Sequence, residues 1–225
     1  METTMYDNLL LLPLFQGLSK NDMTTIIEKV KPNFQTFQEG DLVFKQGDSC
    51  HQLIFLLNGQ LITSIPDRNH AFSLSEVIEG PCMIEPHSLF GMSPFFAATY
   101  RANTPVGIMS IDKSYIFTEL NNYEIFRLNF LNLLSNSTQT AHRKLWNTHV
   151  GTMNEKLVNF LRMRCLRTKG AKVLQISMEE LAKLIGETRI NVSRLLNEMQ
   201  DKGLVQLRRR EIFIPEFEKM IEYLS

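Results

Sequence analysis

The sequence predicts an α+β protein, and three observations lead to that prediction. From about residue 33 to residue 117, short apolar segments alternate with glycine-containing turns, the pattern of antiparallel strands. Residues 121–146 contain neither glycine nor proline and have the apolar spacing of one long helix. The last third of the chain has short helical segments followed by two short strands. We therefore expect three parts, namely residues 1–120, 121–148 and 149–225.

The first part is expected to be an antiparallel β-roll with flanking helices. Residues 5–30 have the composition of two helical segments that separate near Pro13, with Ser19 as the N-cap of the second. Asn58-Gly59 between two apolar runs is a strong hairpin signal. Strands are expected at Phe34–Phe37, Leu42–Phe44, Leu53–Leu57, Leu61–Ile65, Phe72–Ile78 and Gly107–Ile111.

The long helix carries a stripe with the spacing of a coiled-coil seam. Its members recur at alternating steps of three and four residues, which keeps them on one face. We predict that this stripe joins two copies of the chain, and the alternative is a helix that packs on its own domain. The members of the stripe are Leu131, Leu134, Thr138, Ala141 and Leu145.

Two short helices joined at a glycine are predicted near the C-terminus. Ser177 can cap the first helix, and Glu180 three residues later completes a capping box. Gly186 lies where the chain must turn, and Thr188 is a good N-cap for the second helix. This is the layout of a helix-turn-helix. The inner face of the second helix is formed by Val192, Leu195, Leu196 and Met199.

A hairpin is expected directly after this motif. Gly203 ends the second helix, and residues 204–207 and 211–214 have the pattern of two strands with three arginines at the turn. A hairpin in this position makes a winged helix, and arginines at its tip suit contact with DNA phosphates.

The second helix of such a motif enters the DNA major groove. Arginine there can pair bidentately with guanine, and Ile190 can pack on a thymine methyl group but cannot accept a hydrogen bond. An ordinary helical hairpin with solvated arginines is the alternative. The candidate DNA-binding residues are Thr188, Arg189, Ile190, Asn191, Ser193, Arg194, Arg208, Arg209 and Arg210.

Charge is unevenly distributed although the formal net charge is zero. Residues 1–140 carry 8 Lys and Arg against 14 Asp and Glu, whereas residues 141–225 carry 16 against 10. A basic C-terminal part fits a nucleic-acid-binding module.

Several classes of protein are not expected. The three cysteines, Cys50, Cys82 and Cys165, have neither metal-site nor disulfide spacing, which fits a reducing compartment. We find no signal peptide, membrane span, phosphate-binding loop or nucleophile elbow, so we expect a cytoplasmic protein with no catalytic residues and no metal site.

The order of a β-roll, a long helix and a winged helix resembles the Crp/Fnr family of bacterial transcription regulators. The resemblance covers almost the whole chain. It is carried by residues 37–48 and 56–61 in the roll, and by Leu181-Ala182, Gly186, Thr188-Arg189, Val192-Ser193-Arg194 and Gly203-Leu204 in the last part. It implies a cyclic-nucleotide-binding-like double-stranded β-helix, a homodimer, paired half-sites on double-stranded DNA, and RNA polymerase as a further partner.

The resemblance also places an effector cassette at residues 89–102. Members that bind cyclic AMP have Gly-Glu near its start and Arg-Ser near its end, where the arginine holds the cyclic phosphate. Here Met92 takes the glutamate position and Phe96-Ala97 takes the Arg-Ser positions. We therefore expect no cyclic nucleotide in the usual mode, and an apolar ligand or none. The expected pocket residues are Phe90, Gly91, Met92, Phe95, Phe96, Ala97 and Thr99.

Other modes of effector sensing, and one other function, remain as alternatives. The chain lacks the N-terminal cysteine cluster of the iron–sulfur members. Haem would need axial ligands such as His51, His70, His87, Met83 or Met92, although lone histidines are more often satisfied surface or core residues. A signalling or scaffold protein whose winged helix binds protein is the rival function. Many family members carry glutamate where this chain has Ile190, so we expect a different DNA site.

Overall fold

The computed structural model describes residues 9–67, 71–146 and 151–224. It divides into two compact units, Met1–Ile62 with Ile78–Gln139 and Thr63–Val77 with Thr140–Ser225. Two features differ from the expected three parts. Residues 63–77, expected in the N-terminal part, pack with C-terminal residues, and the long helix spans the division at Gln139.

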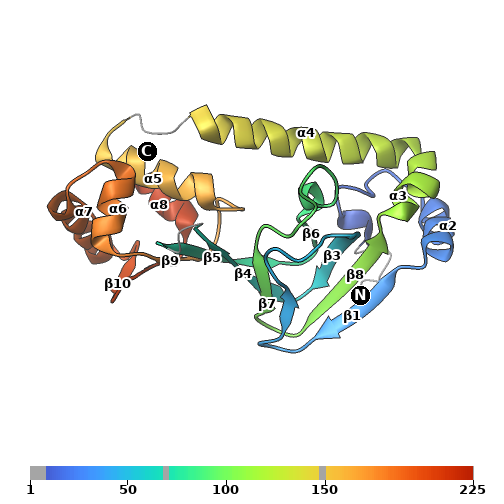
Figure 1. The fold of residues 1–225 in the computed structure, drawn as a ribbon, viewed down its shortest axis with the longest axis horizontal. Coiled ribbons are helices and arrows are strands. Elements are labelled where there is room, and N and C mark those ends of the chain that lie inside the picture. Colours follow the sequence, from blue (N-terminus) through green and yellow to red (C-terminus); the bar gives the residue numbers. More distant parts are fainter. Residues whose placement is uncertain (1–8, 68–70, 147–150, 225) are drawn as a thin grey trace. The chain divides into compact units, whose positions relative to one another are not determined.

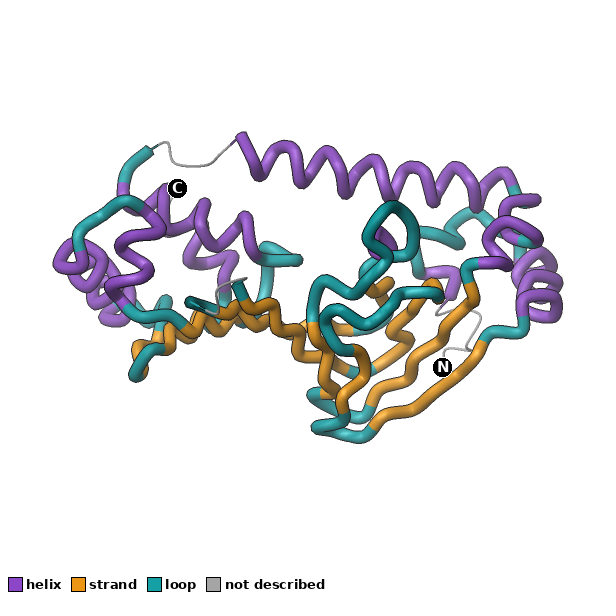
Figure 2. Tube along the Cα trace, viewed as in Figure 1, coloured by secondary structure: helices purple, strands orange, loops and turns teal. Residues whose placement is uncertain are grey.

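The first unit contains the antiparallel β-roll (Figures 1 and 2). Four of its strands form a sheet in the order β1-β8-β3-β6, with antiparallel neighbours, and β2 pairs antiparallel with β7. The elements are α2 (Lys20–Val30), β1 (Asn33–Phe37), β2 (Leu42–Phe44), β3 (Gln52–Asn58), β6 (Cys82–Ile84), the 3₁₀ turn η1 (Pro86–Ser88), β7 (Thr99–Ala102), β8 (Val106–Asp112), α3 (Ser114–Thr118) and η2 (Leu120–Asn122).

The N-terminal helices follow the predicted signals. Ser19 caps α2 in a complete capping box, in which its Oγ accepts from Asp22 N at 3.1 Å and its N–H donates to Asp22 Oδ2 at 3.2 Å. Of the first helical segment predicted from residue 5, residues 9–11 are helical, and residues 5–8 lie outside the described residues.

The long helix α4 (Glu124–Trp146) is confirmed, and its first part is anchored in the core of the β-roll. The ring of Phe126 lies 6.2 Å from that of Phe15, which in turn lies 5.4 Å from Phe55 of β3. Asn129 Nδ2 donates to the carbonyl oxygens of Leu14 at 3.2 Å and Gln16 at 2.8 Å. These contacts hold the start of α4 against the N-terminal segment.

The hairpin predicted at Asn58-Gly59 joins β3 to β4 (Gln60–Pro66). Gly59 has φ +80°, and a Cβ atom there would lie 2.4 Å from the carbonyl oxygen of Pro105. Any other residue would therefore both strain the backbone and collide with the neighbouring loop.

The second unit contains residues 63–77, where β4 is followed by β5, together with the C-terminal helices and strands. The strands β10, β11, β9 and β5 are successive antiparallel neighbours, with β5 residue Leu74 opposite Leu174 of β9. Its elements besides β4 and α4 are β5 (Ser73–Glu79), α5 (Met153–Arg164), β9 (Lys172–Gln175), α6 (Met178–Ile185), α7 (Arg189–Asp201), β10 (Gln206–Arg208), β11 (Glu211–Ile214) and α8 (Phe217–Leu224).

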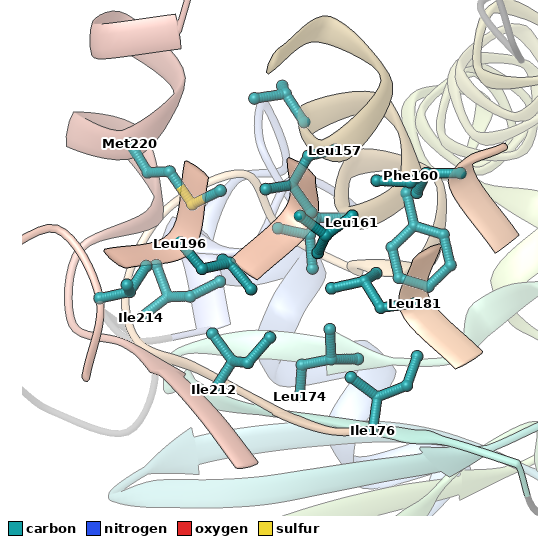
Figure 3. Close-up of a cluster of buried hydrophobic side chains, with 14 of the residues drawn as sticks. Leu157, Phe160, Leu161, Leu174, Ile176, Leu181, Leu196, Ile212, Ile214 and Met220 are labelled. Carbon is teal, nitrogen blue, oxygen red and sulfur yellow. The ribbon is translucent and has the colours of Figure 1, made fainter. Parts of the chain in front are cut away.

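A single apolar cluster fills this unit (Figure 3). Leu157 and Leu161 of α5 face Leu196 of α7, while Leu174 and Ile212 come from the sheet. Each is at most 3% exposed. Burial of a leucine or isoleucine side chain contributes about 1.5–3 kcal/mol, so this core fixes the helix-turn-helix on its sheet.

All six predicted strands appear within one or two residues, but several short elements were not predicted. These are β6, η1, β7, α3, η2, β9 and α8. The three strands have only three or four residues, too few for alternation to show. Helix α5 begins at Met153, because Thr152 forms a capping box with Glu155, and it ends at Arg164.

Candidate nucleic-acid interface and sensor region

The helix-turn-helix is set by local hydrogen bonds. Ser177 Oγ accepts from Glu180 N at 3.1 Å, which is one half of the predicted capping box. Gly186 ends α6 in the left-handed conformation with φ 67°. Thr188 Oγ1 then accepts from Asn191 N at 3.2 Å and starts α7. The predicted caps and turn therefore all lie where they are needed.

An ion pair fixes the turn from the side of α5. Lys156 Nζ lies 2.7 Å from Glu187 Oε1, and both side chains are largely buried. The hydrogen bond from Lys156 lowers the pKa of Glu187 below its ordinary value. The pair joins α5 to the turn that precedes α7.

The two faces of α7 differ sharply. Its predicted inner residues are at most 4% exposed, whereas Ile190 is 79% exposed. The outer face borders an open groove of about 520 Å³ that contains four predicted DNA-binding residues, Arg189, Ile190, Ser193 and Arg194. The groove is also lined by Asn197, Glu198 and Asp201. A large exposed isoleucine between arginines has no role in the core of this unit.

Asn191 acts on this face through another residue. Its Oδ1 accepts from Arg194 Nη2 at 3.3 Å, so it orients the Arg194 guanidinium. Arg189 Nη1 lies 3.6 Å from Glu179 Oε1, but both side chains are more than two-thirds exposed. Such a pair contributes little and leaves Arg189 available to another partner.

The wing arginines lie at the turn between β10 and β11, and all three are exposed. Arg208 Nη1 pairs with Glu211 Oε1 at 3.2 Å, and Arg210 takes φ 56° at the turn. Arg208 and Arg210 share a cleft of about 240 Å³ with Arg189. The structure thus brings the start of α7 and the wing together.

The predicted pocket residues differ in their exposure and in their neighbours. Phe96 is buried and stacks on Phe44 with ring centroids 4.8 Å apart, while Phe90 packs edge-on against Phe117 at 5.4 Å. Met92, by contrast, is fully exposed. Phe95 is 47% exposed, and Gly91 and Ala97 are exposed as well. A Cβ atom added at Gly91 would meet no atom within 4 Å. Thr99 is partly buried, and its Oγ1 accepts from Gln46 N at 3.1 Å.

Sequence reasoning missed Glu85, which lies beside these residues. It is 5% exposed and follows β6 with φ 40°. Its carboxylate accepts hydrogen bonds from Ser88 Oγ, Ala97 N, Ala98 N and Tyr100 Oη. A single glutamate after a short strand gives no sequence signal of such an environment.

The predicted seam of α4 is open on this chain. Leu131 is 62% exposed and Leu145 is 67% exposed, whereas Leu134 is partly buried. Thr138 and Ala141 are exposed, and Thr138 Oγ1 donates to the Leu134 carbonyl at 3.0 Å, so its hydroxyl is satisfied within the helix.

The described residues contain no group of three or more His, Cys, Asp or Glu side chains that could hold a metal ion. His70, one of the haem-ligand candidates, lies outside them. No helix in the described ranges is both long enough and apolar enough to cross a membrane.

Comparison with known proteins supports the DNA-binding part first. Residues 155–223 match the Crp-like helix-turn-helix domain. The chain is 27% identical over 210 residues to a global nitrogen regulator of Nostoc sp. strain PCC 7120, covering 81% of this chain and 85% of that protein. A global nitrogen regulator of Synechocystis sp. strain PCC 6803 is 24% identical over 207 residues, covering 83% and 86%.

Solved structures support the fold of the whole chain. The catabolite activator protein of Thermus thermophilus aligns with a TM-score of 0.50 and 18% identity, covering 94% of this chain and 97% of that one. CprK complexed with OCPA aligns with a TM-score of 0.51 and 13% identity, covering 90% and 93%. The chain therefore carries a Crp-like helix-turn-helix domain at residues 155–223, is similar over most of its length to transcription regulators, and shares the fold of catabolite activator protein.

Proposed function

We propose that this protein is a cytoplasmic homodimer that binds paired half-sites on double-stranded DNA through α7. The observation that carries the proposal is the exposed face of this helix, where Arg189, Ile190, Ser193 and Arg194 border one groove while the opposite face is fixed in the core. Arginine reads guanine and isoleucine packs on thymine methyl groups, so the face suits a site containing both bases.

The wing adds contacts that do not depend on sequence. Arg209 and Arg210 are exposed at its tip, and Arg208 carries only an exposed pair with Glu211. Contacts from these arginines to phosphates would position α7 in the groove. Because Arg189 shares a cleft with Arg208 and Arg210, the wing and the helix would lie along one DNA backbone segment.

The exposed stripe of α4 supports the homodimer. Leu131 and Leu145 are each more than 60% exposed on α4, and a second copy that covers this stripe would remove its apolar surface from water. Two copies related by a two-fold axis would also explain binding to paired half-sites, because the symmetry of the site mirrors that of the protein.

The sensor part would not hold a cyclic nucleotide in the usual mode of the family. By the resemblance, Phe96 takes the position of the phosphate-binding arginine, and here it is buried against Phe44. An anion placed there would lack its cation. An effector, where there is one, would act by binding one of two states of the dimer more tightly than the other.

The test is selection of bound duplexes from a random pool, followed by measurement of affinity for the selected sequence. We expect a two-fold-symmetric site that binds at least about 10³-fold more tightly than a scrambled duplex at the same salt concentration. Equal affinity for the selected and the scrambled duplex would mean that DNA binding is only non-specific. That result would favour the alternative of a scaffold protein whose winged helix binds protein.

The dimer is tested separately by Leu131→Glu, which places a charge on the stripe. Asn136→Glu adds the same charge on the opposite side of α4, where the residue is also exposed. We expect the first variant to sediment as a monomer and the second to remain a dimer. If both variants remain dimers, the stripe is not part of the dimer interface.

A further inference from the structure

The Glu85 carboxylate has the environment of a ligand in a receptor. Its Oε2 accepts from Ser88 Oγ at 2.7 Å and from Ala97 N at 2.7 Å. Its Oε1 accepts from Ala98 N and from Tyr100 Oη, each at 2.9 Å. A carboxylate has about four acceptor positions, so all of them are filled.

All four donors are neutral, and no ion pair among the described residues involves Glu85. Buried carboxylates are costly unless they are paired or hydrogen-bonded. Here the compensation comes from two successive backbone N–H groups and two hydroxyls that converge on one point. Successive N–H groups directed at one point form an anion-binding concavity.

The donors come from separate parts of the first unit. Ser88 ends the turn η1, Ala97 and Ala98 precede β7, and Tyr100 lies in β7 itself. Ala98 and Tyr100 are at most 1% exposed, so packing also holds these two donors in place. Glu85, in contrast, takes a left-handed conformation with φ 40°, which is disfavoured for a side chain of this kind. This backbone conformation places the Glu85 carboxylate within hydrogen-bond distance of the four donors.

We propose that Ser88, Ala97, Ala98 and Tyr100 form a receptor for one carboxylate group and that Glu85 is its built-in ligand. A ligand tethered to its receptor by a chain of at most 15 residues has an effective concentration in the millimolar range or above. A carboxylate from solution therefore has to displace Glu85 before it can bind. In this arrangement the chain itself fills the receptor between η1 and β7.

A receptor and a set of hydrogen bonds that only stabilises the loop (a brace) behave differently when Glu85 is removed, and the difference can be measured. A preorganised receptor keeps its shape when the ligand is removed and then accepts a substitute, whereas a brace leaves only a destabilised loop. Glu85→Gly is the appropriate variant because glycine removes the carboxylate and tolerates the positive φ. Formate and acetate are the probes, since each supplies one carboxylate.

The experiment is thermal unfolding of the full chain in sodium formate, in sodium acetate and in sodium chloride at equal ionic strength. We expect the Tm of Glu85→Gly to rise by several degrees with formate or acetate, saturating in the millimolar range, and the wild-type Tm to stay unchanged. Leu89→Ala is the control, because Leu89 is 1% exposed in the same segment and its side chain donates no hydrogen bond. It should lose stability without a saturable gain.

The same Tm for Glu85→Gly in all three salts would overturn the proposal, as would an equal gain in Leu89→Ala. Should Glu85→Gly not fold in chloride, refolding yield replaces Tm. Recovery in formate but not in chloride supports the receptor, and no recovery in either contradicts it.

Discussion

Arg194 lies on the exposed side of α7, where Asn191 Oδ1 holds its guanidinium at 3.3 Å. An arginine oriented in this way loses less side-chain freedom when it binds a base. Arg194→Ala should weaken binding to the selected duplex by about 1–3 kcal/mol and binding to a scrambled duplex much less.

Fluorescence anisotropy titration of both duplexes at one salt concentration measures this difference. Lys219→Ala is the matched control, because Lys219 on α8 is an exposed positive charge of the same unit and pairs with Glu216. Equal losses for the two variants would mean that Arg194 contributes only charge.

Folding buries the Cys165 thiol and protects it from alkylation. It is 2% exposed, and burial raises its pKa to about 12, with a further contribution from Glu76. Because the thiolate is the reactive form, the native protein at pH 8 should leave Cys165 unmodified by iodoacetamide, and unfolding should expose it. Peptide mass spectrometry measures both states, and rapid labelling of the native chain at Cys165 would contradict the burial.

The pairing of β5 with β9 joins residues 73–76 to the C-terminal part of the second unit. Lys172 Nζ lies 3.0 Å from Glu76 Oε2, and both side chains are at most 1% exposed. The Glu76 carboxylate also accepts from the N–H groups of Leu166 and Arg167. Nearby, the Arg164 guanidinium lies 3.9 Å from the ring centroid of Phe160 and 5.2 Å from that of Phe72.

Lys172→Ala should lower the free energy of unfolding by about 3–5 kcal/mol, because it leaves the Glu76 charge buried without its cation. Urea unfolding measures the loss. Lys169→Ala, which removes an exposed lysine three residues earlier, should change stability by less than about 0.5 kcal/mol. Similar values for both would show that the buried pair does not hold the hairpin strand on β9.

The wing is the element expected to carry the salt dependence. Replacing Arg208, Arg209 and Arg210 together with alanine removes up to three phosphate contacts. Each such contact contributes ~0.9 to the slope of log K against log salt concentration, so the slope should flatten by up to about 2.7. Titrations across a series of salt concentrations measure it, and a slope equal to that of the wild type would exclude the wing from the interface.

The sequence predicted the elements whose signals are local. Ser19, Ser177 and Thr188 cap helices as expected, and Gly59 and Gly186 turn the chain, because each acts on residues within a few positions. The recognition face followed from the same local pattern.

Features that depend on distant segments could not be predicted in this way. Glu76 and Lys172 are separated by 96 positions in the sequence, and a lysine in a strand gives no sign that it is buried. Glu85 acquires its donors from residues up to 15 positions away, which only the closed roll brings together. Within the predicted pocket residues, Phe96 is buried whereas Met92 is fully exposed, and the local sequence pattern does not distinguish the two.

At the scale of the whole molecule, two copies joined along α4 would present two α7 helices to one duplex. The half-sites should then be centred about 34–36 Å apart, which is 10–10.5 base pairs, or a multiple of this spacing. A single copy would read only one half-site.

The measurement that tests this account most directly is the mass of the complex with the selected duplex, determined by native mass spectrometry. We predict two chains for each duplex, and loss of the complex when one half-site is moved by five base pairs, half a helical turn. One chain for each duplex, with affinity unaffected by the spacing of the half-sites, would contradict the account.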